Sequence, residues 1–211
     1  MLKYTISILL FLVSFTTYAE EFVAGKDYAV LTGASAGDQS QNANSIVVKE
    51  FFSYGCPWCF KLEPALEKWV AQQGDKITFA RIPVVFKSEW VYYAKAYYTA
   101  QALQLDSKLS PELFKAIITD KQPLNSNEAM VGFFKSHGVD EKTACSAFNQ
   151  SPTIDLQINA SKNEMGQYQI SAIPAFIINN QYKTDLQMAQ SPERLFEILN
   201  SLITKSGKSA S

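Results

Sequence analysis

Two cysteines separated by two residues, Cys56 and Cys59, follow an apolar segment at 46–52 after a short turn. The apolar segment predicts a strand, and the helical pattern that begins at Cys56 places both sulfurs on the first turn of a helix. Unpaired backbone N–H groups and the positive end of the helix dipole favour a thiolate at Cys56. Cys59, one turn later, points toward the sheet and is shielded. One activated and one shielded sulfur predict a site for thiol–disulfide exchange.

The two residues between the cysteines modify this site. Pro57 falls at an early helical position, where its missing N–H group costs nothing. Trp58 offers a large aromatic face beside Cys56 but no charge. A lower pKa of Cys56 stabilises the reduced form, so the disulfide form oxidises other thiols more readily.

Two other interpretations of the cysteine pair are a zinc site and a structural disulfide. A zinc site needs about four ligands, and the other candidates, Cys145 and His137, lie far along the chain in a helical region. A structural disulfide rarely uses this spacing at a strand–helix turn. The sequence therefore favours a redox pair, Cys56 and Cys59, with no metal and no further cofactor. We expect Cys145 to be a buried, inert thiol rather than a reactive one, and His137 to lie at a helix C-terminus.

Residues 1–19 have the pattern of a secretory signal peptide. Lys3 supplies the positive end, an apolar core spans 6–15, and Thr17 and Ala19 are small residues before a cleavage site at Glu20. The alternative is an N-terminal membrane anchor, but the apolar core is too short to span a bilayer. Export to an oxidising compartment allows a disulfide to persist.

The charge balance is nearly neutral, with 19 basic and 20 acidic side chains. No basic run is present, which argues against a nucleic-acid interface.

The remaining pattern alternates between strands and helices. Strands are predicted at 28–31, 46–52, 77–82, 171–178 and 181–184, with a polar loop at 32–45 and a hairpin turn at Asn179 and Asn180. Between 88 and 168 the pattern is helical. Helix starts are predicted at Ser110 with Pro111, at Asn125 or Ser126, at Asp140, at Ser151 with Pro152, and at Ser191 with Pro192. The last helix is expected to end near Leu202. This order predicts an α/β sheet with an inserted helical block.

Four features together resemble the DsbA-type periplasmic thiol–disulfide oxidoreductases. They are the Phe-x-x-x-x-Cys-Pro-Trp-Cys motif from Phe51, the segment 81–86, the helical insertion, and Ile173 with Pro174 before the returning strand. The resemblance implies a thioredoxin fold with an inserted all-helical domain. It divides the chain into a signal peptide at 1–19, a thioredoxin-like domain at 20–87 and 169–205, a helical insertion at 88–168, and a disordered tail at 206–211.

The resemblance also implies roles for individual residues. Cys56 would be the nucleophile that forms mixed disulfides, and Cys59 the resolving thiol. Ile173 and Pro174 would be joined by a cis peptide bond, in a loop that faces the active disulfide and offers backbone groups to an extended substrate strand.

Glu50 lies six residues before Cys56 on a strand that we expect to be buried. The family has a matching glutamate, which implies a buried carboxylate that relays protons to Cys59. Arg81 on the neighbouring strand is its expected charge partner, because a lone buried charge is costly. The alternative is a glutamate at a strand end that reaches solvent.

One residue departs from the family. Its best-known members carry histidine at the position of Trp58, so one source of thiolate stabilisation is absent here. We therefore expect this protein to oxidise less strongly than those members. Trp58 is also expected to form part of a substrate groove.

The function that follows is that of a monomeric, exported dithiol oxidase, which passes the Cys56–Cys59 disulfide to newly exported proteins with free thiols. As the family implies, a DsbB-type membrane quinone oxidoreductase would reoxidise it. One alternative is a disulfide isomerase or reductase, although such isomerases typically carry an N-terminal dimerisation domain and 20–45 is too short for one. Another is a non-catalytic chaperone that binds through Trp58 and Ile173, for which replacing Cys56 by serine would leave activity intact.

Overall fold

The computed structural model describes residues 22–31 and 45–208. The expected signal peptide at 1–19 and nearly all of the expected loop at 32–45 lie outside the described residues. Within the described part, no helix is both long and apolar enough to cross a membrane.

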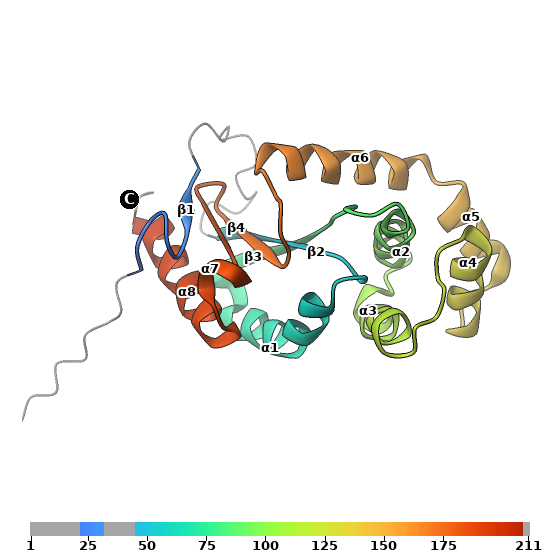
Figure 1. Cartoon of the computed structure of the whole chain (residues 1–211). Coiled ribbons are helices and arrows are strands. Elements are labelled where there is room, and N and C mark those ends of the chain that lie inside the picture. Colours follow the sequence, from blue (N-terminus) through green and yellow to red (C-terminus); the bar gives the residue numbers. More distant parts are fainter. Residues whose placement is uncertain (1–21, 32–44, 209–211) are drawn as a thin grey trace, which may run out of the picture.

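The centre of the molecule is a five-stranded sheet with the order β1-β5-β4-β2-β3 (Figure 1). Its strands are β1 (Ala29–Val30), β2 (Ile46–Phe52), β3 (Ile77–Pro83), β4 (Ala175–Ile178) and β5 (Tyr182–Asp185). Strand β2 runs parallel to β3 and antiparallel to β4, and β4 and β5 form an antiparallel hairpin. The strand–helix–strand unit from β2 to β3 and the β4–β5 hairpin therefore share one sheet, as the sequence predicts, and most of the chain between β3 and β4 is helical.

Strand β2 is covered on both faces, which explains its nearly continuous apolar sequence. Val48 is fully buried in the apolar cluster that the sheet shares with α1 (Pro57–Gln73) and α8 (Pro192–Lys208). Phe51, pointing to the other face, is fully buried in the cluster shared with the helical block. The carboxyl end of this central strand leads directly into the turn before Cys56.

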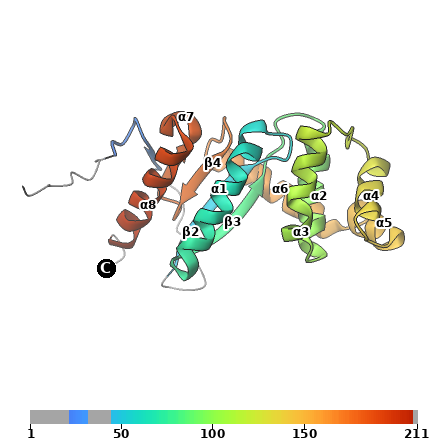
Figure 2. The same cartoon turned by 90° about the horizontal axis from the view of Figure 1, so that it is seen from below.

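Helices cover both faces of the sheet (Figures 1 and 2). The other helices are α2 (Trp90–Ala102), α3 (Asp106–Phe114), which continues into a π turn at Lys115–Thr119, α4 (Asn127–Ser136), α5 (Glu141–Asn149), α6 (Pro152–Gln167) and α7 (Leu186–Ala189). Helices α1, α7 and α8 lie on one side of the sheet, α6 lies on the other, and α2 to α5 form a block beyond the β3 edge.

Three of the helix caps predicted from the sequence are confirmed by their hydrogen bonds. The side chain of Ser126 accepts the Ala129 N–H at 3.1 Å before α4, and Asp140 accepts the Thr143 N–H at 3.0 Å before α5. Ser191 accepts the N–H of Arg194 at 3.2 Å. Each cap satisfies one of the orphan N–H groups of the first turn.

The helix start predicted at Ser110 and Pro111 is wrong, because both residues lie inside α3, which begins at Asp106. The Ser110 hydroxyl does not cap a helix; it forms a buried hydrogen bond of 2.7 Å with the hydroxyl of Tyr54. Ser110, which looks like a helix cap in the sequence, therefore binds a residue far away in the sequence instead.

The predicted ends of two other elements also differ from the structure. Strand β4 begins only at Ala175, after the cis Ile173-Pro174 bond, rather than at 171. Helix α8 continues to Lys208 instead of ending near Leu202. The last turns are held by tertiary contacts, since Ser206 is fully buried and the Lys205 ammonium lies 2.7 Å from the Tyr28 hydroxyl.

An aromatic cluster fixes the turn between β2 and α1 against the helical block. The ring of Tyr54 packs edge-on against Phe52 at 5.3 Å and against Phe114 at 4.9 Å between centroids. On the other side of the turn, Trp90 of α2 lies directly against Gly55. The position of Cys56 thus depends on the helical block as well as on the sheet.

Replacing Gly55 by alanine is expected to destabilise the protein. The added Cβ would lie 2.5 Å from Nε1 of Trp90 and 3.0 Å from the Tyr93 ring, so packed aromatic side chains would have to move. We expect a loss of about 1–3 kcal/mol in the free energy of unfolding, measured by urea titration. Gly132→Ala is the matched control: Gly132 lies in α4 with nothing within 4 Å of its Cβ position, and this change should stabilise the helix by about 0.5–1 kcal/mol. Equal effects of the two substitutions would contradict this packing.

Candidate active site

The sulfur of Cys56 is the N-cap of helix α1. Cys56 has an extended backbone (φ −95°, ψ 113°), Pro57 follows at the first helical position, and the Cys59 N–H donates to the Cys56 Sγ at 3.2 Å. This is the place that a serine or aspartate oxygen takes at other helix starts. The predicted position of Cys56 at the helix N-terminus is therefore confirmed.

The two thiols have opposite acidities. Hydrogen bonding from the Cys59 thiol, aided by the backbone N–H groups of Cys59 and Trp58, lowers the pKa of Cys56 to about 7 against the effect of burial. Burial, and then the hydrogen bond and charge of Cys56, raise the pKa of Cys59 well above its ordinary value. Both cysteines are free thiols in this structure. Near neutral pH the pair can therefore hold one thiolate and one thiol.

The loop before β4 lies against the reactive sulfur. The Ile173-Pro174 peptide bond is cis, and the carbonyl oxygen of Ile173 lies 3.7 Å from the Sγ of Cys56. These residues are separated by more than a hundred positions in the sequence, and the antiparallel pairing of β4 with β2 brings them together.

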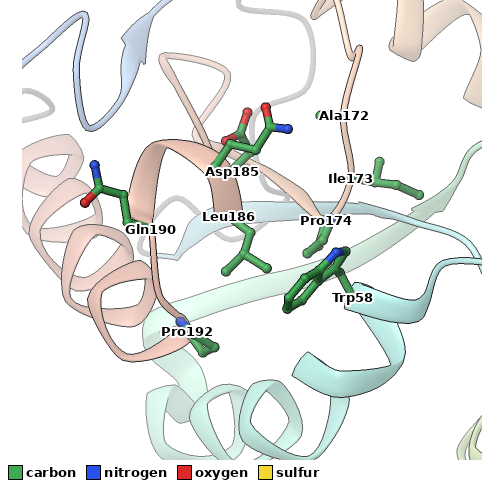
Figure 3. A pocket seen from close by; sticks show the side chains of 9 residues that line it. Trp58, Ala172, Ile173, Pro174, Asp185, Leu186, Gln190 and Pro192 are labelled. Atoms are coloured by element: carbon green, nitrogen blue, oxygen red, sulfur yellow. The ribbon is translucent and has the colours of Figure 1, made fainter.

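A pocket of about 410 Å³ opens beside this loop (Figure 3). It is lined by Trp58, Ala172, Ile173, Pro174, Asp185, Leu186, Gln187, Gln190 and Pro192. In Figure 3 the Trp58 ring lies beside Pro174, and Leu186 points toward it from the start of α7. Trp58 is 56% exposed, and the Lys61 ammonium sits 4.5 Å from the centroid of its ring. The wall formed by α7 was not identified from the sequence.

Beneath the cysteines, three charged side chains are packed together inside the protein. Nε of Arg81 lies 2.9 Å from Oε2 of Glu50, and its two Nη atoms bind the carboxylate of Glu63 at 2.7 and 2.8 Å. Glu50 is fully buried, and its oxygens have no hydrogen-bond partner among the described residues, so the contact with Arg81 is an ion pair without an aligned hydrogen bond. Burial raises the pKa of Glu50 to about 7, although Arg81 acts in the opposite direction.

The burial of Glu50 and its pairing with Arg81 agree with the prediction, and the alternative of a solvent-reaching glutamate does not hold. Glu63 was missed. Its only sequence signal is its place four residues after Cys59, on the same stripe of α1 as the buried Leu62 and Leu66. A carboxylate on a buried stripe needs a cation, and Arg81 supplies it.

The other two candidate residues lie in the helical block. The expectation of a buried Cys145 is wrong: its side chain is half-buried, because α4 and α5 leave an open pocket where it lies, and the Asn149 amide is 3.5 Å from its sulfur. His137 is the C-cap of α4, as expected, with Nδ1 2.8 Å from the Phe133 carbonyl. Among residues 22–31 and 45–208, no three His, Cys, Asp or Glu side chains are grouped as metal ligands would be.

Comparison with known proteins identifies the family of this fold and site. The DSBA-like thioredoxin domain model matches residues 47–200. The chain is 33% identical over 180 residues to the thiol:disulfide interchange protein DsbA of Burkholderia cepacia, covering 85% of this chain and 84% of the relative. It is 28% identical over 187 residues to the protein of that name from Pseudomonas aeruginosa, covering 89% and 87%.

Solved structures agree with the family match. The crystal structure of Pseudomonas aeruginosa DsbA superposes with a TM-score of 0.83 at 28% identity, covering 90% of this chain and 96% of that one. The match spans both the sheet and the helical block. The chain therefore belongs to the family of DsbA-like thioredoxin-domain proteins and is a thiol:disulfide oxidoreductase of the DsbA type.

Proposed function

We propose that this protein is a periplasmic dithiol oxidase that introduces disulfide bonds into exported proteins through Cys56 and Cys59. The observation that carries the proposal is the state of Cys56. Its sulfur caps α1, its pKa is lowered to about 7, and the Ile173 carbonyl lies beside it. A stabilised thiolate makes Cys56 a good leaving group and favours the reduced enzyme, which is what a disulfide donor requires.

The reaction begins with the oxidised enzyme, in which Cys56 and Cys59 are joined. A substrate thiolate attacks Sγ of Cys56, a mixed disulfide forms, and Cys59 leaves with the electron pair of the broken S–S bond. A second substrate thiolate then attacks the substrate sulfur of the mixed disulfide and releases Cys56 as a thiolate. Two substrate thiols are oxidised and the enzyme disulfide is reduced by two electrons, so atoms and charge balance.

Glu50 is the proton carrier for the buried thiol in this proposal. The Cys59 sulfur has a raised pKa and must gain a proton when it leaves. Glu50 is close enough for its charge to raise the pKa of Cys59, and its own pKa of about 7 lets it hold or release a proton near neutrality. Arg81 and Glu63 hold Glu50 in place.

The pocket beside Trp58 is the proposed binding site for an extended segment of the substrate. The carbonyl of Ile173, which lies beside Cys56, offers backbone pairing, and Trp58, Pro174 and Leu186 offer apolar contact. One solved relative supports this proposal: the DsbA of Proteus mirabilis has been determined with a non-covalently bound peptide, PWATCDS, and superposes at a TM-score of 0.71 with 25% identity, covering 90% of this chain and all of that one.

The family membership supports three further parts of the proposal. A DsbB-type membrane quinone oxidoreductase would reoxidise the pair, the segment 1–19 would direct export, and the cysteine pair would be the sole redox group. We propose that the enzyme acts as a monomer.

A second candidate, a disulfide reductase or isomerase, is favoured by one observation. No cationic side chain contributes to the lowered pKa of Cys56, and Trp58 fills the place of a histidine. The redox potential distinguishes the two functions. A non-catalytic binding module is separated from both by Cys56→Ser, which removes oxidation but would leave pure binding intact.

We expect the redox potential of the Cys56–Cys59 pair, equilibrated with glutathione, to lie above the value of about −270 mV for thioredoxin and below that of about −120 mV for a strongly oxidising DsbA. Trp58→His should raise it by about 30 mV for each unit by which the imidazole lowers the pKa of Cys56. Phe86→His, which also replaces an exposed aromatic residue, is the control. A value at or below that of thioredoxin would favour the reductase.

The alkylation rate of Cys56 is expected to rise with pH around a midpoint near 7, because only its thiolate reacts with iodoacetamide. Replacing Cys59 by alanine removes the thiol donor that contributes most to the low pKa, so the midpoint should move upward. Cys145→Ala serves as the control and should leave the midpoint unchanged. A midpoint that stays near 7 in Cys59→Ala would show that this hydrogen bond is not the main cause.

The free energy of unfolding of the reduced protein should depend on pH through Glu50. Its pKa is raised on folding, so the stabilisation of its protonated form is complete below about pH 4.5 and is lost as the pH rises through about 7. The free energy of unfolding of Glu50→Gln, relative to that of the wild type, should therefore become more favourable by up to about 3 kcal/mol as the pH rises across this interval. Urea titrations at several pH values measure the difference, with the exposed Glu141→Gln as control. A difference that is constant with pH would contradict the raised pKa.

A further inference from the structure

The outer edge of strand β3 carries backbone groups that the sheet does not use. The Val84 N–H donates to the Phe52 carbonyl at 2.8 Å, and Phe52 lies opposite Pro83 in the parallel register. Because N–H and C=O groups alternate in direction along a strand, those of Phe79 and Arg81 point away from β2. Within the described residues, no hydrogen bond outside the β2–β3 ladder uses the N–H of either residue. Pro83, which has no N–H, falls on the same outer side, as expected for an edge strand.

This edge forms one wall of a groove of about 660 Å³, distinct from the pocket beside Cys56. The groove is bounded by β3, by the C-terminal half of α1, and by α2, α3 and α6. Figure 2 shows β3 as the strand of the sheet nearest to these last three helices. Its apolar wall includes Val70 from α1, Tyr97 from α2 and Ala160 from α6. The groove therefore offers apolar contact beside a free strand edge.

The charged side chains that line the groove determine which ligands it favours. Arg81, the one cation among the described residues that line it, is already bound to Glu50 and Glu63, and Glu164 is paired with Lys49 at 2.8 Å. The remaining carboxylates, Glu67 and Asp106, form no ion pair within the described residues and line the groove from α1 and α3. The groove is thus left with uncompensated negative charge.

We propose that this groove binds an extended polypeptide segment in which Lys or Arg alternates with apolar residues, added to β3 as a sixth strand. The segment's backbone would pair with the outward N–H and C=O groups of Phe79 and Arg81. Its basic side chains would meet Glu67 and Asp106, and its apolar side chains the Val70 and Tyr97 wall. Edge-to-edge pairing of two copies of this chain is disfavoured, because it would bring the same carboxylates together.

The site goes beyond the proposed oxidase function and does not depend on it. Helix α1 carries Cys56 at its start and Glu67 eleven residues later, which is roughly 16 Å along the helix. About five extended residues span that distance. An unfolded polypeptide that occupies the groove would therefore keep a nearby thiol at high effective concentration at Cys56.

The test uses the full chain and a peptide without cysteine, acetyl-Val-Lys-Thr-Lys-Val-amide, so that thiol exchange plays no part. Titration monitored by amide NMR should give saturable shifts at Phe79 and Arg81, and slower hydrogen exchange of these two amides. A peptide methylated at alternate backbone nitrogens should lose this binding, and the matching Glu peptide should bind more weakly. Shifts confined to Trp58 and Ile173, unsaturable shifts, equal binding of the methylated peptide, or self-association of the protein would each overturn the proposal.

Charge variants test the occupant's chemistry. Glu67→Lys combined with Asp106→Lys should weaken binding of the Lys peptide by roughly tenfold, whereas Glu193→Lys combined with Glu197→Lys, exposed on α8 outside the groove, should not. Thermal unfolding of both double variants checks that they are folded. Equal affinity of the two double variants for the Lys peptide would overturn the assignment of a basic partner.

Discussion

Arg81 holds two buried carboxylates at once, and the placement of the active site depends on this contact. Glu50 comes from the central strand and Glu63 from the helix that carries both cysteines, so one guanidinium group ties β2, β3 and α1 together. The planar fork of arginine suits this task, because it binds Glu63 with two nitrogens and still reaches Glu50 with a third. Removing one member of such a buried cluster typically costs about 3–5 kcal/mol.

The same sharing explains the raised pKa of Glu50. Glu63 takes both aligned hydrogen bonds of the guanidinium, and Glu50 is left with an ion pair that does not fully offset its burial. Its pKa therefore stays near 7 despite the adjacent cation. A carboxylate that is imperfectly satisfied is unfavourable for stability, but its raised pKa suits the proton exchange with Cys59 that we propose.

Local chemistry in the sequence was sufficient to predict the parts of the site that depend on neighbouring residues. The strand, the tight turn, Cys56 at the helix start and Pro57 at the first helical position are all consequences of residues within one short segment. The predictions that failed depend on partners far away. Ser110 has the pattern of a cap, but Tyr54 binds it across the core. The last helix was expected to end near Leu202, but it continues to Lys208, and Lys205 in its last turns reaches Tyr28, far away in the sequence.

Glu63 and the α7 wall of the pocket were not predictable for the same reason. A glutamate on a helix is usually exposed at the surface. Its partner Arg81 is identified only when β3 is placed beside α1. Leu186 and Gln190 join Trp58 only through the β4–β5 hairpin. Cys145 was misjudged because burial of a small thiol depends on how closely α4 and α5 pack, which periodicity does not report.

The cap of helix α1 links chemistry to local order. A thiolate at Cys56 accepts the Cys59 N–H as a charged cap, but the same sulfur is a neutral, weak acceptor once it is bonded to another sulfur. The first turn of α1 is therefore held firmly in the reduced protein and loosely in the oxidised or mixed-disulfide forms. Each catalytic cycle weakens and then restores this capping hydrogen bond. The first turn of α1 is therefore least stabilised while the enzyme holds a mixed disulfide with its substrate.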